Sequence, residues 1–110
     1  MSDYWTPAHR AVEHEDAETL ARLLGDGSDP DEVFGDMTLL THAIDAEGDG
    51  CLQSGPPPTV HTTAVLLAFG AAPELADPAG RSPMDMAEHY GHDLAVKLLR
   101  AHIGRAAGNR

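Results

Sequence analysis

The chain has 110 residues, 42% of them hydrophobic and only 5% aromatic, with a formal net charge of −11. This length is enough for one domain with a modest core, and no apolar run approaches the roughly 18 residues that indicate a membrane helix. Residues 1–49 hold 13 of the 18 acidic residues but only two of the seven basic ones, whereas residues 50–110 are balanced. That distribution argues against nucleic acid or an anionic membrane as ligand and favours a basic partner. The alternative is an acidic surface that only keeps a small protein in solution.

The cysteine content and the first residues bear on the compartment. A lone Cys51 cannot form an internal disulfide, so a reducing, cytoplasmic setting is the simplest interpretation. Residues Met1 to Trp5 lack the positive and apolar segments of a secretory signal, and no signal peptide is expected. Arg outnumbers Lys six to one, as in proteins of high-GC bacteria.

Two helices are predicted in the first stretch. Thr6-Pro7 opens a short helix, because Thr caps helix N-termini and Pro is tolerated at the first helical position. Its apolar face is formed by three small residues: Ala8, Ala11 and Val12. Glu15-Asp16 marks a turn, and Asp16 caps a second helix over Ala17–Leu24. That helix has an apolar face and ends at the glycines that follow it. The face consists of Leu20, Leu23 and Leu24.

The middle stretch is longer than the first. Thr38 to Ser82 spans 44 residues, against 32 from Thr6 to Thr38. The extra residues fall in Glu47–Thr59, which contains three glycines and Pro56-Pro57-Pro58. This composition predicts a loop inserted between two helices. The second of these helices is expected from about Val60 to Phe69.

The last stretch repeats the pattern of the first. Asp77 to Arg81 is turn chemistry, and Ser82-Pro83 begins a helix that runs to about His89 and is broken by Gly91. A second helix is predicted over Asp93–Ala101, followed by a flexible tail at residues 105–110. Its inward-facing residues are expected to be Leu94, Leu98 and Leu99.

One motif therefore occurs three times. It reads Thr-Pro-Ala-His-Arg-Ala from Thr6, Thr-Leu-Leu-Thr-His-Ala from Thr38, and Ser-Pro-Met-Asp-Met-Ala from Ser82. Each copy precedes a Leu-Leu pair, and a period near 33 residues is typical of stacked solenoids. With Gly70-Ala71 and Gly91-His92, the set resembles the ankyrin repeat family over about residues 4–103.

The resemblance implies an all-α, ankyrin-like solenoid of three helix-turn-helix repeats with short β-hairpin fingers. The ankyrin repeat domain would occupy residues 1–104, with units at about 4–36, 37–80 (insert 47–59) and 81–104. Leu39 replaces the family's Pro and Asp36 its hairpin Gly, so the finger Val33–Met37 is expected to be irregular and to use Gly35 for its tight backbone. A monomer is expected when the protein is free.

The resemblance also implies a partner surface on hairpin tips and first helices. Phe34, Met37 and Tyr90 are large, and nothing in the helical pattern requires them inside. They are expected to act as anchors within an acidic rim. The insert 47–59 is a further candidate contact. The expected partner-binding residues are Tyr4, Glu13, His14, Phe34, Asp36, Met37, Asp45, Pro78, Arg81, His89 and Tyr90.

Seven histidines raise a metal alternative, since His89 and His92 have ligand-like spacing. His9 and His92, however, occupy family positions at which the imidazole bonds loop backbone, so neither a metal nor a cofactor is expected. Cys51 has no evident base beside it and no catalytic motif is legible, so no enzyme is expected. Three other histidines are candidates for surface contacts: His14, His42 and His89.

These observations lead to one main hypothesis and two alternatives. The main one is a non-enzymatic inhibitor or immunity-type protein that occludes a basic toxin or enzyme. In it, acids such as Glu13, Asp36 and Asp45 mimic an anionic substrate. The first alternative is an adaptor or regulator that scaffolds a cellular protein without inhibiting it. The second is a metal-binding or enzymatic protein that uses His89, His92 or Cys51.

Overall fold

The computed structural model describes the backbone of residues 5–54 and 59–108 and the side chains of residues 5–49 and 59–104. Tyr4 and Pro56-Pro57-Pro58 lie outside the described residues. The elements are α1 (Pro7–Glu13), α2 (Ala17–Gly25), β1 (Val33–Phe34), β2 (Met37–Thr38), α3 (Leu39–Ser54), α4 (His61–Ala68), α5 (Pro83–His89) and α6 (Asp93–Gly108).

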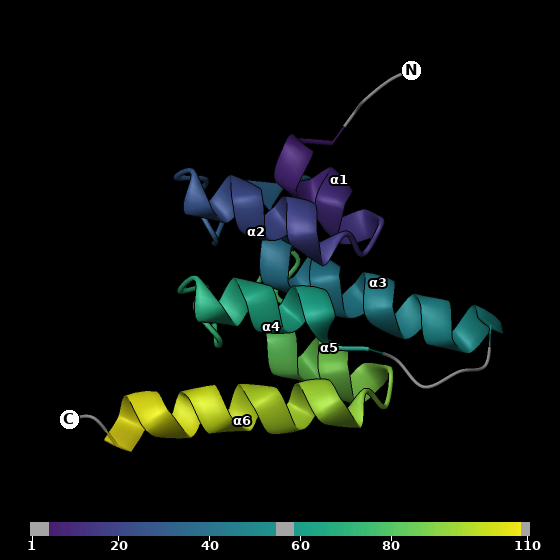
Figure 1. Ribbon diagram of the computed structural model, residues 1–110. Coiled ribbons are helices and arrows are strands. Elements are labelled where there is room, and N and C mark those ends of the chain that lie inside the picture. Colours follow the sequence, from purple (N-terminus) through teal and green to yellow (C-terminus); the bar gives the residue numbers. More distant parts are fainter. Residues whose placement is uncertain (1–4, 55–58, 109–110) are drawn as a thin grey trace.

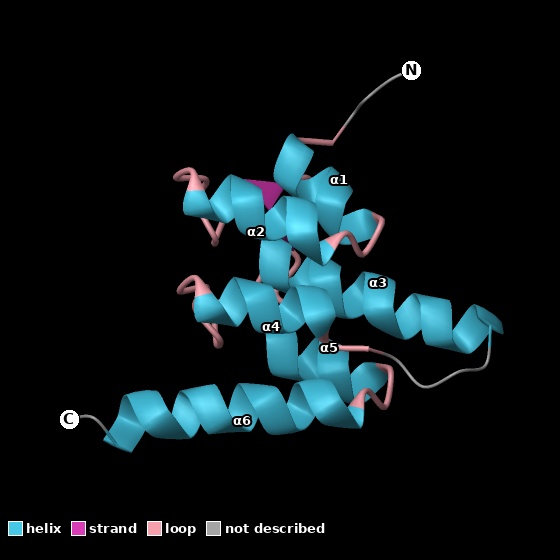
Figure 2. Ribbon diagram, in the orientation of Figure 1, coloured by secondary structure: helices cyan, strands magenta, loops and turns pink. Residues whose placement is uncertain are grey.

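The helices form two layers that run along the stack (Figures 1 and 2). One layer consists of α1, α3 and α5, each packed on the next, and the other of α2, α4 and α6. Strands β1 and β2 form an antiparallel hairpin between the first two helix pairs, in which Phe34 pairs with Met37. Gly35 takes a φ of 66° in its turn, a conformation that favours glycine. The predicted helical solenoid with a short hairpin, and the role of Gly35, are confirmed.

Side-chain caps set the start of the first helix in the first and last repeats. The Thr6 hydroxyl accepts a hydrogen bond from the His9 amide at 3.2 Å. Ser82 and Asp85 form a reciprocal capping box, with bonds of 3.0 and 3.1 Å. Each hydroxyl thereby satisfies a backbone amide that has no partner within its own helix.

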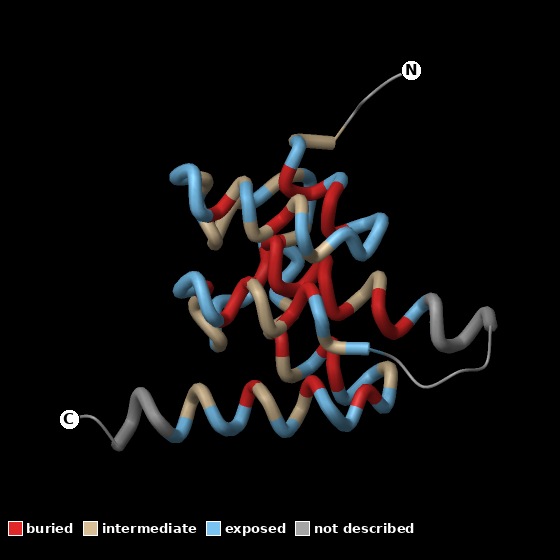
Figure 3. The backbone as a smooth tube through the Cα atoms, in the orientation of Figure 1, coloured by how far each residue is buried: buried red, intermediate tan, exposed pale blue. Residues whose placement is uncertain are grey.

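Burial of the second helices follows each repeat's place in the stack. In the central α4, Leu66 and Leu67 are both buried, because repeats cover it on two sides. If the first and last repeats are aligned so that Thr6 matches Ser82, Leu20 of α2 corresponds to Val96 of α6. Leu20 is fully buried in the first repeat, whereas Val96 is only half-buried in the last. Figure 3 shows the buried residues concentrated between the layers and towards the middle. The end repeats therefore each bury one side and leave the other to solvent.

The predicted loop over Glu47–Thr59 is wrong as far as Ser54. Helix α3 continues without a break from Leu39 to Ser54. Gly48 and Gly50 lower helix propensity locally, but tertiary contacts override so weak a preference. The contacts responsible involve Glu47 and Gly48, and they come from residues far along the chain.

Two expectations for the last helix are also wrong. Helix α6 extends to Gly108, so residues 105–108, which were expected to follow the helix as a tail, are helical. Leu94 is 52% exposed and does not face inward, whereas Leu99 is fully buried. Leu94 aligns with Glu18, an exposed residue of α2, because both positions lie on the side of the helix away from the stack.

Candidate functional site

Glu47 of α3 is the centre of a buried polar cluster that joins α3 to the first turn of α4 and to His92, the residue before α6. Its carboxylate accepts bonds from the Thr62 hydroxyl (2.7 Å), the Thr63 amide (3.2 Å) and the Thr63 hydroxyl (2.8 Å). The fourth donor is Nε2 of His92, 2.9 Å from Oε1. Both side chains are completely removed from solvent. A buried carboxylate is tolerated when its lone pairs are satisfied in this way.

The ring of His92 is held in one tautomer. Its Nε2 faces two acceptors, Glu47 Oε1 and the Thr59 carbonyl at 3.0 Å, so it carries the hydrogen. Its Nδ1 is buried without a partner among the described residues, as suits the bare nitrogen of a neutral ring. The prediction that His9 and His92 bond loop backbone is confirmed, because His9 Nε2 likewise lies 3.3 Å from the Glu32 carbonyl. The carboxylate beside His92 was not foreseen, since Glu47 was assigned to a loop.

A second polar chain crosses from the first repeat to the second. Nδ1 of His9 lies 2.9 Å from Nδ1 of His42, and His42 Nε2 lies 2.8 Å from Glu13 Oε1. The two imidazoles are stacked, with Trp5 edge-on to His42. His42 is 4% exposed, so its assignment to surface contacts is wrong. Burial first, and then the charge of His42, lower the pKa of His9 from its usual value.

Tyr90 joins α5 to α3. Its hydroxyl donates a hydrogen bond of 2.6 Å to Asp45 Oδ1, and His89 contacts its ring edge-on. A Cβ on Gly48 would lie 2.4 Å from Tyr90 Cγ, so the ring packs directly on the glycine backbone. The bond to Asp45, followed by burial, raises the pKa of Tyr90 to about 12. The ring is half-buried, although nothing in the helical pattern of the sequence requires it inside.

The other predicted contact residues differ in exposure. Glu13, His14 and Asp36 are exposed, whereas Phe34 and Met37 are half-buried. Phe34 contacts the His9 ring at a centroid distance of 6.0 Å, so it also has a packing role. The hairpin thus has an exposed acid, Asp36, in its turn, and the half-buried side chains of Phe34 and Met37 flank that turn.

The remaining two predicted contact residues, Pro78 and Arg81, lie in the segment before α5. Pro78 is exposed, while Arg81 pairs with the buried carboxylate of Asp77 at 3.1 Å. The structure brings Arg81, His89 and Tyr90 together on the wall of a hollow of about 340 Å³, which Asp85 and Met86 complete. These three predicted contact residues therefore lie on one surface depression.

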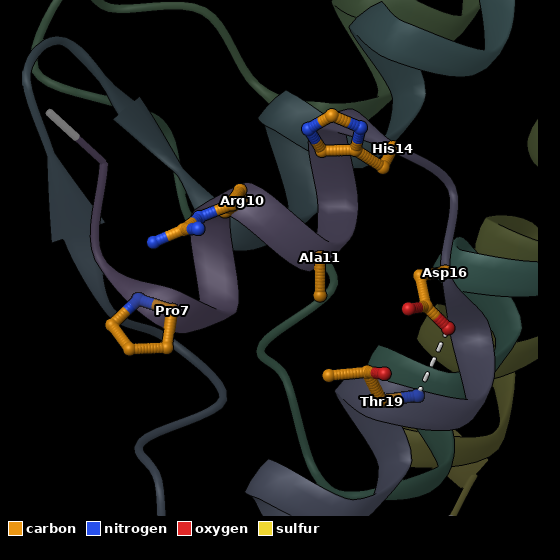
Figure 4. Close-up of a pocket in the computed structure, with 6 residues that line it drawn as sticks. All are labelled: Pro7, Arg10, Ala11, His14, Asp16 and Thr19. Carbon is orange, nitrogen blue, oxygen red and sulfur yellow. Dashed lines mark hydrogen bonds between the residues drawn. The ribbon is translucent and has the colours of Figure 1, made fainter. Parts of the chain in front are cut away.

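A second hollow, of about 320 Å³, lies at the open end of the first repeat (Figure 4). Pro7, His14 and Thr19 are on its wall, and Asp16 accepts the Thr19 amide at 3.1 Å within it. With Thr6 aligned to Ser82, Pro7 and Thr19 correspond to Pro83 and Ala95, which are buried in the last repeat. This hollow therefore corresponds to the side by which the last repeat packs on the repeat before it.

The metal alternative gains no site within the part of the chain that the structure describes. No group of three potential metal-ligating side chains gathers among the residues that the structure describes. His92 is committed to Glu47 and Thr59, and the Cys51 side chain lies outside the described part. No helix within residues 5–54 and 59–108 is both long and apolar enough to cross a membrane.

The fold is similar to that of a solved ankyrin repeat domain from Acinetobacter baumannii AYE. The TM-score is 0.73 at 30% sequence identity, and the match covers 89% of this chain and 47% of that one. This chain therefore spans about half the length of the matching structure. No family model matches the sequence.

Proposed function

The chain is a stack of three ankyrin repeats, and we propose that it is a non-enzymatic inhibitor or immunity-type protein that occludes a basic partner. Stacks of this kind generally serve as protein-binding scaffolds, because each repeat adds surface to a continuous face. The narrower proposal rests on the chemistry of this chain's own surface.

The observation that carries the proposal is that the acidic residues of the first half lie at the surface, with few basic residues in the same segment to balance their charge. Residues 5–49 contain twelve acidic residues, and all except Glu47 are at least partly exposed. Arg22, one of the two basic residues in the same segment, already pairs with Glu18 at 2.7 Å. A field of one sign steers a partner of the opposite sign and increases its association rate.

The hairpin and the adjoining helices supply the contact itself. Asp36 is exposed at the hairpin tip beside the half-buried Phe34 and Met37, and Glu13 is exposed at the end of α1. Aromatic and Met side chains inside a polar rim are a common composition of a binding interface, and here the rim is acidic. Asp45 and Tyr90 lie farther along the stack, where their mutual hydrogen bond holds them in place. Occlusion follows if acids on this surface take the position of an anionic substrate.

The experiment uses the whole chain as immobilised bait. Wild type, Phe34→Ala/Met37→Ala and Asp36→Asn are compared in capture of a basic protein at low and high salt, after circular dichroism confirms folding. The matched control is Glu18→Gln/Asp26→Asn, which removes exposed acids from α2 and its end. Both hairpin variants should lose the captured protein, the control should keep it, and high salt should weaken capture. Equal capture by wild type and the hairpin variants would refute this surface.

A second measurement separates inhibition from scaffolding. The activity of the captured protein is assayed with increasing amounts of the chain. Stoichiometric loss of activity supports occlusion. Full activity in the saturated complex would overturn the inhibitor proposal and leave the adaptor reading.

A further inference from the structure

Three contacts in series connect the first repeat to the second through two histidine rings. The series runs from the Glu32 carbonyl to His9 Nε2 (3.3 Å), and from His9 Nδ1 to His42 Nδ1 (2.9 Å). It ends with His42 Nε2 and Glu13 Oε1 (2.8 Å). The Glu32 carbonyl oxygen also accepts a hydrogen bond of 3.0 Å from the Leu39 amide. It is therefore an acceptor toward both Leu39 and His9.

Counting hydrogens along this series decides its protonation. A carbonyl and a carboxylate stand at the two ends, so both Nε2 atoms must donate. If both rings are neutral, each Nδ1 is then a bare lone pair, and the two meet at 2.9 Å with no hydrogen between them. If both rings are protonated, two N–H groups point at each other. One added proton satisfies every contact, whether it resides on a ring or moves along the bond to Glu13.

We infer that His9 and His42 share one proton in the folded protein, which makes the contact between the first two repeats sensitive to pH. The inference does not depend on the proposed binding function. Two carboxylates face the pair: Glu13 from α1, and Glu32 from the segment before β1, whose Oε1 accepts the Thr6 hydroxyl at 2.9 Å. Trp5 and Phe34 cover the rings with apolar surface.

The lowered pKa of His9 agrees with this assignment. His42 bonds directly to Glu13, so the state with the charge on His42 places cation and anion in contact. His9 is then the neutral ring, donating through Nε2 and accepting through Nδ1. Since the two sites interact strongly, the proton belongs to the pair rather than to one residue alone.

A pH dependence with a maximum follows. Above the usual histidine pKa of about 6.5, unfolded rings are neutral, whereas the folded pair holds one proton. Folding then takes up a proton, so stability falls as pH rises until the folded pair also releases it. Below that pKa the unfolded rings hold two protons and the folded pair one, so stability also falls as pH decreases. The pair therefore stabilises the fold most near about pH 6.5, where the folded and unfolded states hold equal numbers of protons on average.

Nuclear magnetic resonance of ¹⁵N-histidine-labelled wild type tests the inference directly. Near pH 7.5, three ring nitrogens of the pair should carry hydrogens, with His9 in the Nε2–H form. If the proton moves to Glu13, a carboxylic-acid signal for Glu13 replaces one of these three, the hydrogen on His42 Nε2. A pair with only two ring hydrogens and an ionised Glu13 would overturn the inference.

A stability series provides the second readout. The unfolding constants of wild type and His42→Gln are compared between pH 6.5 and 9, with exposed His14→Gln as the matched control. The wild-type constant should rise relative to His42→Gln by up to tenfold per pH unit, the slope of one linked proton. The His14→Gln profile should parallel wild type. Parallel profiles of wild type and His42→Gln across this range would refute the shared proton.

Discussion

Oε1 of Glu47 and Nε2 of His92 lie 2.9 Å apart in complete burial, although 45 positions separate the residues. Through this pair the overlong helix of the second repeat is fastened to the start of α6. Thr62 and Thr63 complete the cluster from the first turn of α4. The cluster therefore explains how α3 passes through two glycines and remains helical to Ser54.

Removal of the Glu47 carboxylate should be strongly destabilising. Glu47→Ala takes the acceptor from three buried donors of Thr62 and Thr63 and leaves His92 Nε2 with only the Thr59 carbonyl, so we expect a loss of about 3–5 kcal/mol in the free energy of unfolding. Chemical denaturation monitored by circular dichroism measures it. The exposed Glu88→Ala on α5 serves as control and should change stability by less than about 0.5 kcal/mol. A loss below about 1 kcal/mol for Glu47→Ala would contradict the cluster's role.

Two helical glycines should respond in opposite ways to alanine. Gly104→Ala in α6 meets open space, so it should gain about 0.5–1 kcal/mol from helix propensity. Gly48→Ala places a Cβ 2.4 Å from Tyr90 Cγ, so α3 and α5 must separate and stability should fall by about 1–3 kcal/mol. Thermal unfolding of the two variants compares them directly. A stabilised Gly48→Ala would show that the ring does not rest on this glycine.

Glu15 occupies a backbone conformation suited to glycine. Its φ is 54°, and the residue at the same place in the last repeat is Gly91, with a φ of 63°. Glu15→Gly should relieve the strain and, after the entropy that glycine adds to the unfolded chain, raise stability by about 0.5–1 kcal/mol. Glu15→Ala removes the same carboxylate but keeps the strain, so it should give no gain. Equal effects of the two substitutions would assign the change to charge instead.

Tyr90 should resist ionisation in alkaline solution. Its pKa is raised from 10 to about 12, so the folded state holds the proton more tightly than the unfolded chain. The stabilisation from this proton is complete below pH 10 and is lost as the pH rises to 12. Phenolate absorbance during a pH titration measures the shift, and Tyr90→Phe identifies which signal belongs to Tyr90. Asp45→Asn should move the pKa back towards 10; an unchanged titration would exclude Asp45 as its main cause.

Several parts of the fold could be predicted because their causes are local. Thr6, Asp16 and Ser82 cap the helices that follow them, and each acts within three residues of itself. Gly35 permits its turn by its own φ. The apolar spacing of Ala8, Ala11 and Val12 identifies the buried side of α1 from neighbours one helical turn apart.

The sequence predicted the acidic character of the candidate contact surface but not which of its side chains pack against the fold. Composition locates the acids in the first half, and exposure of Glu13 and Asp36 agrees with that expectation. Partners distant in the chain determine which large side chains pack: Tyr90 rests on Gly48, and Phe34 contacts His9. Likewise, Glu13 reaches His42 across 29 positions, a pairing that no helical periodicity encodes.

The sequence by itself determined the repeat, the helix starts and the placement of charge, since each depends on residues within a few positions or on composition alone. Tertiary structure alone decided that Glu47 to Ser54 are helical, that His42 is buried and that His92 bonds a carboxylate. The physical reason is the same in all three cases. A polar group or glycine that disfavours an element locally is accepted when neighbouring repeats satisfy its hydrogen bonds or fit closely against it.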